Sequence, residues 1–191
     1  GSGKSLTTVS ILEKADPSFT ADRVHFDPAD FVRQVNNIPE DERQGKAVMM
    51  DESGVGMGSR TWFDEGQVAF NKMMQTARDD NMIVGLTLPV LDELDSQFRN
   101  RLHGFCEMWD LKREEYAEWS WKNYEVSRDE YSGVYKKYPK LRWKGRIRKI
   151  KRLKIGPPSE ELRQNYEAKK QEFKDELYAE TQEHLEEAEE E

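Results

Sequence analysis

The stretch Gly1-Ser2-Gly3-Lys4-Ser5 decides how the rest of the chain is interpreted. It matches the closing half of the phosphate-binding pattern G-x-x-x-x-G-K-[ST], with Gly3, Lys4 and Ser5 in the last three places. In such a loop, backbone N–H groups and the N-terminus of the following helix surround the phosphates. The lysine reaches the β- and γ-phosphates, and the hydroxyl holds Mg²⁺. The pattern therefore predicts a metal ligand at Ser5 and nucleotide binding by six residues: Gly1, Ser2, Gly3, Lys4, Ser5 and Leu6.

A helix is expected directly after this loop, because Leu6, Val9 and Leu12 recur at helical spacing. The first glycine of the full pattern, and the strand that leads into it, would precede Gly1, and the chain has no initiating Met. We therefore expect the chain to begin inside a longer protein, without the first strand of its fold. Taken alone, the five residues would also fit a flexible tail or a cloning remnant, so the later segments must decide.

The second informative segment is Lys-Ala-Val-Met-Met-Asp-Glu at positions 46–52, a short apolar run that ends in two acids. The run favours a buried strand. In a phosphate-loop fold, an Asp at the end of such a strand supports Mg²⁺ through water, which is the role predicted for Asp51. Glu52 can then polarise an attacking water as the general base. A core strand followed by an N-capping Asp is the plainer alternative. The position of this segment, about 45 residues after the phosphate-binding pattern, favours a nucleotide site.

Two later segments add candidate catalytic residues. Residues 81–89 favour another buried strand that ends near Thr87, whose hydroxyl could contact the γ-phosphate or the attacking water. An ordinary strand-end threonine is equally open. After a short helix expected over 91–95, Arg99 and Arg101 could place a guanidinium on the γ-phosphate of a neighbouring subunit. They could also be solvated or salt-bridged arginines.

The order GSGKS, VMMDES, IVGLTLP, FRNRL resembles that of P-loop ATPases with an additional catalytic Glu. More narrowly it resembles the FtsK–HerA superfamily, and within it the zonula-occludens-toxin-like ATPases of filamentous phages and of archaeal viruses and plasmids. The resemblance covers about residues 1–109, and residues 154–162 are similar to the end of such proteins. It implies a RecA-like three-layer α/β sandwich, hydrolysis of ATP with Mg²⁺ in a ring of identical subunits, and coupling of hydrolysis to DNA translocation, packaging, or assembly or export of a virus or mobile element.

Two other classes of function remain open at this point. A nucleotide-binding morphogenesis or anchoring module without significant turnover is the main alternative. Glu52 argues against it, because a pure switch does not need a base at the end of the strand. A kinase of a small molecule is the third, but no lid with clustered arginines and no acceptor pocket can be recognised in the sequence.

The composition fits one α/β domain with an appendage and excludes several other classes of site. Hydrophobic residues make up 36% of the 191 residues and the mean hydropathy is −0.97, so part of the chain must lie outside a packed core. No run approaches the roughly 20 apolar residues of a membrane span. One Cys and three His do not support a zinc site or a disulfide, and they fit a reducing cytoplasm, where we expect the protein to act.

The net charge of −8 conceals a strong asymmetry along the chain. Residues 136–154 contain eleven Lys and Arg and no acid, whereas residues 159–191 contain thirteen acids and four bases. The basic stretch is a candidate for contact with nucleic-acid phosphate. A solvated hairpin that neutralises the acidic tail is the alternative. The candidate nucleic-acid-binding residues are Lys136, Lys137, Arg146, Arg148, Lys151 and Arg152.

We expect three regions: an ATPase domain over 1–110, a basic, aromatic-rich β extension over 111–157, and a C-terminal helix with an acidic tail over 158–191. The last strand of the ATPase sheet is expected over 102–110. The final helix should begin after a capping Ser159 and fray past Tyr178, where nearly all residues are acidic.

Within these regions, turn and cap signals set the expected elements. Asp27 and Pro28 should open a helix to about Val35, and a second helix is expected over 62–78. The extension should contain three strands, over 116–126, 134–138 and 145–155.

Overall fold

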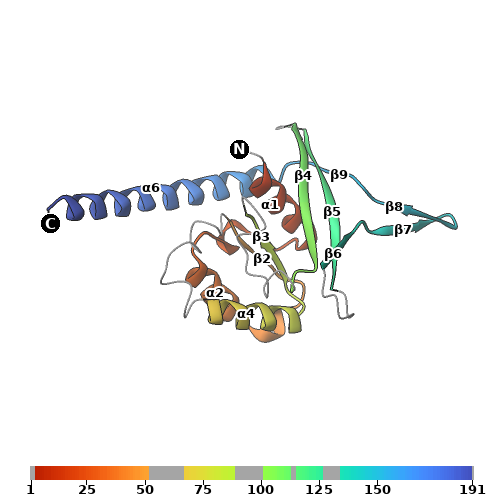
Figure 1. Ribbon diagram of the computed structural model, residues 1–191, viewed down its shortest axis with the longest axis horizontal. Coiled ribbons are helices and arrows are strands. Elements are labelled where there is room, and N and C mark those ends of the chain that lie inside the picture. Colours follow the sequence, from red (N-terminus) through yellow and green to blue (C-terminus); the bar gives the residue numbers. More distant parts are fainter. Residues whose placement is uncertain (1–2, 52–66, 89–100, 113–114, 127–133, 191) are drawn as a thin grey trace. The chain divides into compact units, whose positions relative to one another are not determined.

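The computed structural model describes residues 3–51, 67–88, 101–112, 115–126 and 134–190 (Figure 1). The chain divides into two compact units, which we call the α/β unit (Leu12–Leu86 and Pro158–Glu191) and the β unit (Gly1–Ile11 and Thr87–Pro157). Helix α1 (Lys4–Ala15) begins in the β unit and ends in the α/β unit. The fold is thus mixed α/β, as the sequence predicts.

The α/β unit is built on a three-stranded parallel sheet in the order β1-β2-β3. Its strands are β1 (Val24–His25), β2 (Ala47–Met50) and β3 (Ile83–Leu86). All four residues of the central strand β2 are apolar and fully buried, which is typical of a parallel strand covered on both faces. The buried strand expected before Asp51 is therefore confirmed. The strand expected before Thr87 is present as β3, but its four residues are only partly buried, so the expected full burial is wrong there.

Two helices make the crossovers that parallel strands require. Asp27 caps α2 (Pro28–Asn37) by accepting hydrogen bonds from the N–H groups of Ala29 (2.8 Å) and Asp30 (3.0 Å), so the predicted cap is confirmed. The helix expected over 62–78 is described from its residue 67 as α4 (Gln67–Asp79). The rings of Phe31 in α2 and Phe70 in α4 lie 5.7 Å apart, between centroids, in the core of this unit.

The long C-terminal helix α6 (Glu160–Glu190) packs on the α/β unit through its first half. Leu162 and Tyr166 are buried, and the ring of Phe173 stacks on that of Phe26 at 4.9 Å between centroids. The expected fraying past Tyr178 is wrong, because the Glu-rich sequence with its Ala residues has high helix propensity. None of the helices in the described part of the chain combines enough length with enough apolar character to cross a lipid bilayer.

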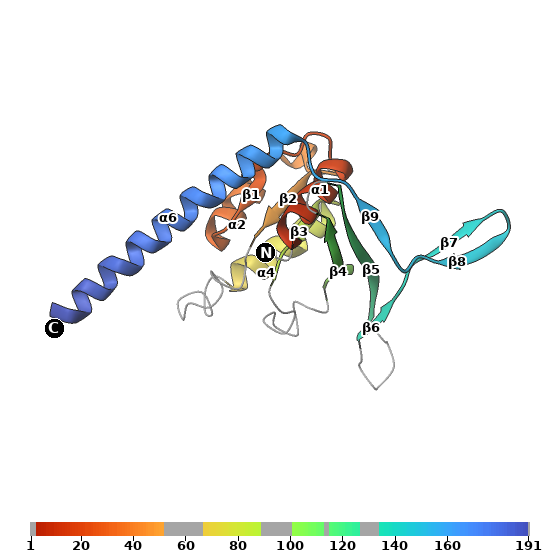
Figure 2. The same cartoon turned by 90° about the horizontal axis from the view of Figure 1, so that it is seen from above.

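The β unit contains an antiparallel sheet (Figure 2). Its strands are β4 (Gly104–Lys112), β5 (Tyr116–Val126), β6 (Val134–Lys137) and β9 (Leu153–Ile155). The long strand β5 pairs with the other three. The expectation that residues 102–110 form the last strand of the parallel sheet is wrong, since β4 pairs with β5. Only three residues separate β4 from β5, and so short a connection permits antiparallel pairing but no parallel crossover.

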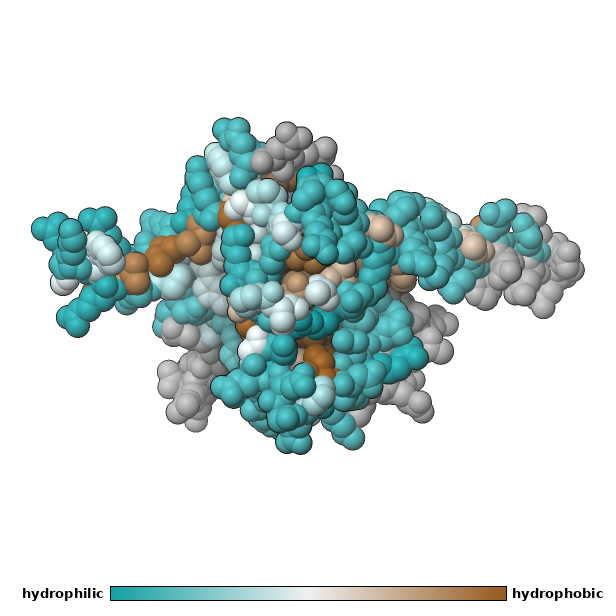
Figure 3. Space-filling model, turned by 180° about the vertical axis from the view of Figure 1, so that it is seen from behind, coloured by the Kyte–Doolittle hydropathy of each residue, from teal (hydrophilic) through white to brown (hydrophobic). Residues whose placement is uncertain are grey.

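The middle of the basic stretch forms a separate two-stranded hairpin of β7 (Lys140–Trp143) and β8 (Arg146–Lys149) (Figure 2). The single strand expected over 145–155 is therefore wrong: its beginning is β8 and its end is β9. Lys144 (φ 48°) and Gly145 (φ 75°) both adopt the left-handed conformation that a two-residue hairpin turn requires. Figure 3 shows apolar side chains (brown) among hydrophilic ones (teal) along this projecting hairpin, at the left.

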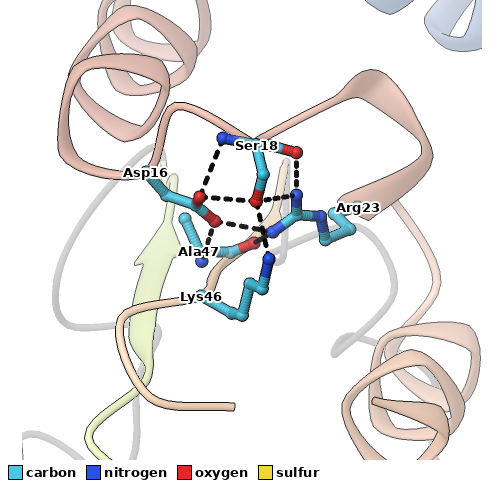
Figure 4. A network of polar contacts seen from close by, with 5 residues as sticks. All are labelled: Asp16, Ser18, Arg23, Lys46 and Ala47. Atoms are coloured by element: carbon cyan, nitrogen blue, oxygen red, sulfur yellow. Dashed lines mark hydrogen bonds and ion pairs between the residues drawn. The ribbon is translucent and has the colours of Figure 1, made fainter. Parts of the chain in front are cut away.

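A buried polar network joins the residue after α1 to the start of β2 (Figure 4). The Asp16 carboxylate accepts hydrogen bonds from Ser18 N–H (2.9 Å) and Oγ (2.7 Å), Arg23 Nη1 (2.6 Å) and Ala47 N–H (2.8 Å). Lys46 Nζ donates to Ser18 Oγ at 2.9 Å. Burial by itself would raise the pKa of Asp16, but these hydrogen bonds outweigh burial and lower that pKa to about 2.

Asp16 should therefore make the free energy of unfolding depend on pH. Its pKa is about 2 in the folded chain and 3.8 ordinarily, so its contribution is complete above about pH 4 and is lost as pH falls through about 2. The shift corresponds to about 2 kcal/mol. In urea titrations, Asp16→Asn should lose about this much stability at pH 7, and its deficit relative to the wild type should shrink towards pH 2.

Asp30→Asn is the matched control, because the Asp30 side chain is 53% exposed and its ion pair with Arg33 lies at the surface. Its effect should stay within about 0.5 kcal/mol at every pH. A deficit of Asp16→Asn that is independent of pH would contradict the assigned role of the carboxylate.

Candidate functional site

The start of α1 carries the predicted phosphate-binding residues. Gly3 precedes the helix with a φ of +73°, in the left-handed region that favours glycine. A Cβ at this position would also come within 2.7 Å of the Leu111 side chain. The N–H groups of the first helical turn have no partner within a helix and carry the positive end of its dipole. This geometry suits a phosphate group, and binding by residues 3–6 stays a prediction.

Lys4 contacts the segment that follows β3. Its Nζ donates a hydrogen bond to the Leu88 carbonyl at 2.8 Å, across 84 positions of sequence and within the β unit. The neighbouring Thr87 is buried. The structure thus brings the predicted phosphate-binding lysine to the segment that contains the predicted catalytic threonine.

Asp51 follows the central strand β2 and is 0% exposed. Its N–H donates to the His25 carbonyl at 2.8 Å, which continues the pairing of β1 with β2. Its carboxylate oxygen Oδ2 accepts hydrogen bonds from the Tyr166 hydroxyl (2.6 Å) and from the Lys170 ammonium (2.9 Å), both on α6. A buried carboxylate needs such donors, because an uncompensated charge in the interior is very costly.

Lys169, the residue before Lys170, holds α6 by a different set of contacts. Its Nζ donates to three backbone carbonyls at and before β1, those of Val24 (2.7 Å), Ala21 (3.3 Å) and Asp22 (3.3 Å). Burial lowers the pKa of Lys169, and nearby acids such as Asp22 oppose that shift. The two adjacent lysines of α6 therefore have separate partners, carbonyls for one and a carboxylate for the other.

Sequence reasoning did not find Tyr166 or Lys170 as site residues. The only signal was their spacing of four residues, which puts both side chains on one helix face. Their partner Asp51 lies 115 and 119 positions away, so the contact depends on how α6 packs.

His25, at the end of β1, adds a second titratable group, which is partly buried. Burial lowers its pKa to about 4, with the positive charge of Lys169 acting in the same direction, so the imidazole is neutral at pH 7. Its Nε2 is buried without a hydrogen-bond partner among the described residues. Its backbone carbonyl accepts the hydrogen bond from the N–H of Asp51.

Several predicted site residues lie outside the described residues: Gly1, Ser2, Glu52 and Arg99. The short helix expected over 91–95 lies outside them as well. Arg101 is described and lies partly buried in the β unit. The two predicted metal ligands belong to different units, Ser5 to the β unit and Asp51 to the α/β unit.

The described ranges contain no group of three or more His, Cys, Asp or Glu side chains arranged for a metal ion. Mg²⁺ at a nucleotide is usually held by one or two protein groups together with phosphates and water, and does not need such a cluster. A hydroxyl and a carboxylate, the groups predicted at Ser5 and Asp51, are ligand types of that kind, and their joint role stays a prediction. The buried charge of Asp51, stabilised here by hydrogen-bond donors, fits a role towards a hydrated cation.

The β7–β8 hairpin presents the predicted nucleic-acid-binding residues Arg146 and Arg148. All ten residues from Lys140 to Lys149 are exposed, and six of them are basic. The register puts Trp143 opposite Arg146 and Leu141 opposite Arg148, so these side chains share one face of the ribbon. Trp143 is 63% exposed, which is unusual for so large an aromatic side chain.

The other basic candidates differ in their surroundings. Arg152 lies 3.4 Å from the Glu118 carboxylate and over the Trp109 ring at 4.9 Å from its centroid. Lys136 lies over the Phe105 ring at 4.7 Å. Lys137 and Lys151 are exposed. Among these described candidates, the hairpin therefore presents the longest run of exposed residues rich in basic side chains.

Comparison with protein-family models, with curated proteins and with solved structures found no match to this chain. Its function is therefore inferred from its own residues and from the sequence resemblance. The residues concerned are those at the start of α1 in the β unit, Asp51 with its two donors in the α/β unit, and the basic hairpin.

Proposed function

We propose that this chain is a Mg²⁺-dependent ATPase of the P-loop type, with a RecA-like core of the FtsK–HerA kind. The observation that carries the proposal is the pairing of two features: a left-handed glycine followed by a helix that starts at Lys4-Ser5, and a fully buried Asp51 after the central parallel strand. Helix N-termini bind anions, and open α/β sheets bind ligands beyond the carboxyl ends of their strands. A parallel three-stranded sheet with crossover helices is compatible with this fold.

Each candidate residue then has a definite role. Lys4 would exchange its hydrogen bond to the Leu88 carbonyl for oxygens of the β- and γ-phosphates, and the N–H groups of the first turn of α1 would bind the same phosphates. Mg²⁺, when bound with the nucleotide, neutralises phosphate charge. Ser5 and, through water, Asp51 would hold it.

The hydrolytic step itself would belong to residues beside these. Glu52 would polarise the attacking water, and Thr87 would contact that water or the γ-phosphate. Arg99 or Arg101 would reach the nucleotide of a neighbouring subunit in a homo-oligomeric ring. A module that binds nucleotide without turnover remains the second candidate, since the contacts of Lys4 and Asp51 serve binding as well as hydrolysis.

Coupling to DNA is the second part of the proposal, and the exposed β7–β8 hairpin supports it. A two-stranded ribbon is one of the elements that the major groove of duplex DNA admits. Six basic side chains within ten exposed residues suit the phosphate backbone, and the exposed Trp143 can contact bases. The alternative, neutralisation of the acidic tail, predicts no effect of the hairpin on DNA affinity.

Lys4→Ala should weaken binding of Mg·ATP by about 10- to 100-fold, because a charge-assisted hydrogen bond to phosphate is lost. Calorimetry with a non-hydrolysable ATP analogue measures the affinity, and phosphate release by the wild type measures turnover. Lys14→Ala, in the last turn of the same helix, is the control and should bind normally. Affinity of Lys4→Ala within a factor of two of wild type would refute the loop assignment. Binding without turnover in the wild type would favour the second candidate.

The double substitution Arg146→Gln and Arg148→Gln should weaken DNA binding and reduce its salt dependence. Each phosphate contact contributes about 0.9 to the slope of log affinity against log salt, so the slope should fall by up to about two. Fluorescence anisotropy with labelled duplex at several salt concentrations gives this slope. Arg33→Gln with Arg78→Gln removes the same charge from helices of the α/β unit and should leave the slope unchanged. An unchanged slope in the folded hairpin variant would exclude the DNA role.

A further inference from the structure

The contact between α6 and Asp51 gives a buried carboxylate a positive partner from the chain itself. Lys170 Nζ lies 2.9 Å from Asp51 Oδ2 and 3.2 Å from the Tyr166 hydroxyl oxygen. The Asp51 side chain is 0% exposed, whereas that of Lys170 is 18% exposed. Lys170 of α6 therefore neutralises the carboxylate of Asp51, which the proposed function assigns to Mg²⁺ binding.

We propose that Lys170 is a resident counter-ion of Asp51 that hydrated Mg²⁺ displaces when Mg·nucleotide binds. This inference rests on the proposed function. In the absence of Mg²⁺, the ammonium of Lys170 stabilises the buried charge. When Mg²⁺ is present, the same carboxylate accepts its hydrogen bonds from metal-bound water, and the Lys170 side chain turns towards solvent.

The chemistry of the two partners explains why they compete. A lysine ammonium and a water bound to Mg²⁺ are both hydrogen-bond donors with positive charge behind them. Two such cations at one carboxylate repel each other, since like charges a few ångströms apart interact strongly where water is excluded. Lys170 thus raises the Mg²⁺ concentration that is needed for Mg²⁺ to bind together with the nucleotide.

The surroundings allow the Lys170 side chain to leave while α6 stays in place. Three contacts of α6 do not involve Asp51: the buried Leu162, the stack of Phe173 on Phe26, and the hydrogen bonds of Lys169 to backbone carbonyls. The Tyr166 hydroxyl still donates to Oδ2 at 2.6 Å and keeps the carboxylate oriented. Displacement of the Lys170 side chain therefore leaves these contacts of α6 in place.

Three substitutions separate competition from a merely structural ion pair. Lys170→Met removes the charge and the donor, and Lys170→Arg keeps both. Lys169→Met is the matched control, because it removes the neighbouring lysine of the same helix, whose partners are carbonyls and not Asp51. Lys170→Gln keeps a donor without the charge and replaces Lys170→Met if that variant does not fold.

The experiment is calorimetry of the full chain with a non-hydrolysable ATP analogue, first with a chelator and then over a series of Mg²⁺ concentrations. The quantity compared is the factor by which Mg²⁺ increases nucleotide affinity. We expect this factor to rise at least about 5-fold in Lys170→Met, at the low end of the usual range of coupling between ligands. It should stay near the wild-type value in Lys170→Arg and in Lys169→Met.

Thermal unfolding of the same variants gives a second readout. Without ligand, both Lys170→Met and Lys169→Met should unfold at a lower temperature than the wild type, because each leaves buried polar groups with fewer partners. Mg·nucleotide should restore more of the loss in Lys170→Met than in Lys169→Met, since the metal supplies the missing positive charge only at Asp51.

If Mg²⁺ increases nucleotide affinity in Lys170→Met by the same factor as in the wild type, or by a smaller one, Lys170 does not compete with the metal. An equal rise of this factor in Lys169→Met would also overturn the proposal. If the wild type binds no nucleotide with or without Mg²⁺, the proposed function fails and this inference fails with it. Nucleotide binding by the wild type with no effect of Lys170 overturns the inference alone.

Discussion

A full negative charge at Asp51, without exposure to solvent, is the constraint on which the rest of the α/β unit depends. The charge lies after a strand of four fully buried apolar residues, where water cannot stabilise it. Two donors from α6, Tyr166 and Lys170, reach it from more than 100 positions away. The C-terminal helix is therefore part of the core of this unit.

The same principle applies to the charged group at the other end of the sequence. The ammonium of Lys4 is held by the Leu88 carbonyl, just as the carboxylate of Asp51 is held by donors of α6. These two charges of the proposed site thus already have partners within the chain. In the proposed function, binding of Mg·ATP exchanges these internal partners for phosphate and metal-bound water, and the affinity reflects the difference between the two sets of interactions.

Local signals predicted the parts of the fold that local interactions determine. The apolar run before Asp51 became a buried strand, and Asp27 with Pro28 became a helix start, because strand burial and caps depend on a few adjacent residues. Pairing was harder to predict: β4 was assigned to the parallel sheet, although its short connection to β5 favours an antiparallel pair. The turn at Lys144-Gly145 escaped notice because Lys is an uncommon residue at a left-handed position. The partners of Asp51 could not be predicted at all, since they depend on the packing of α6.

The measurement that tests the central claim most directly is nucleotide binding by Asp51→Asn, with a chelator and with Mg²⁺. Asn keeps the shape of the side chain and an oxygen that can accept from Tyr166 and Lys170, so the fold should persist. We expect its affinity for the ATP analogue to match the wild type within a factor of about two in chelator, and the increase that Mg²⁺ gives to be lost. An increase with Mg²⁺ equal to that of the wild type would contradict the assignment of Asp51 to the metal, and with it the nucleotide site proposed for this chain.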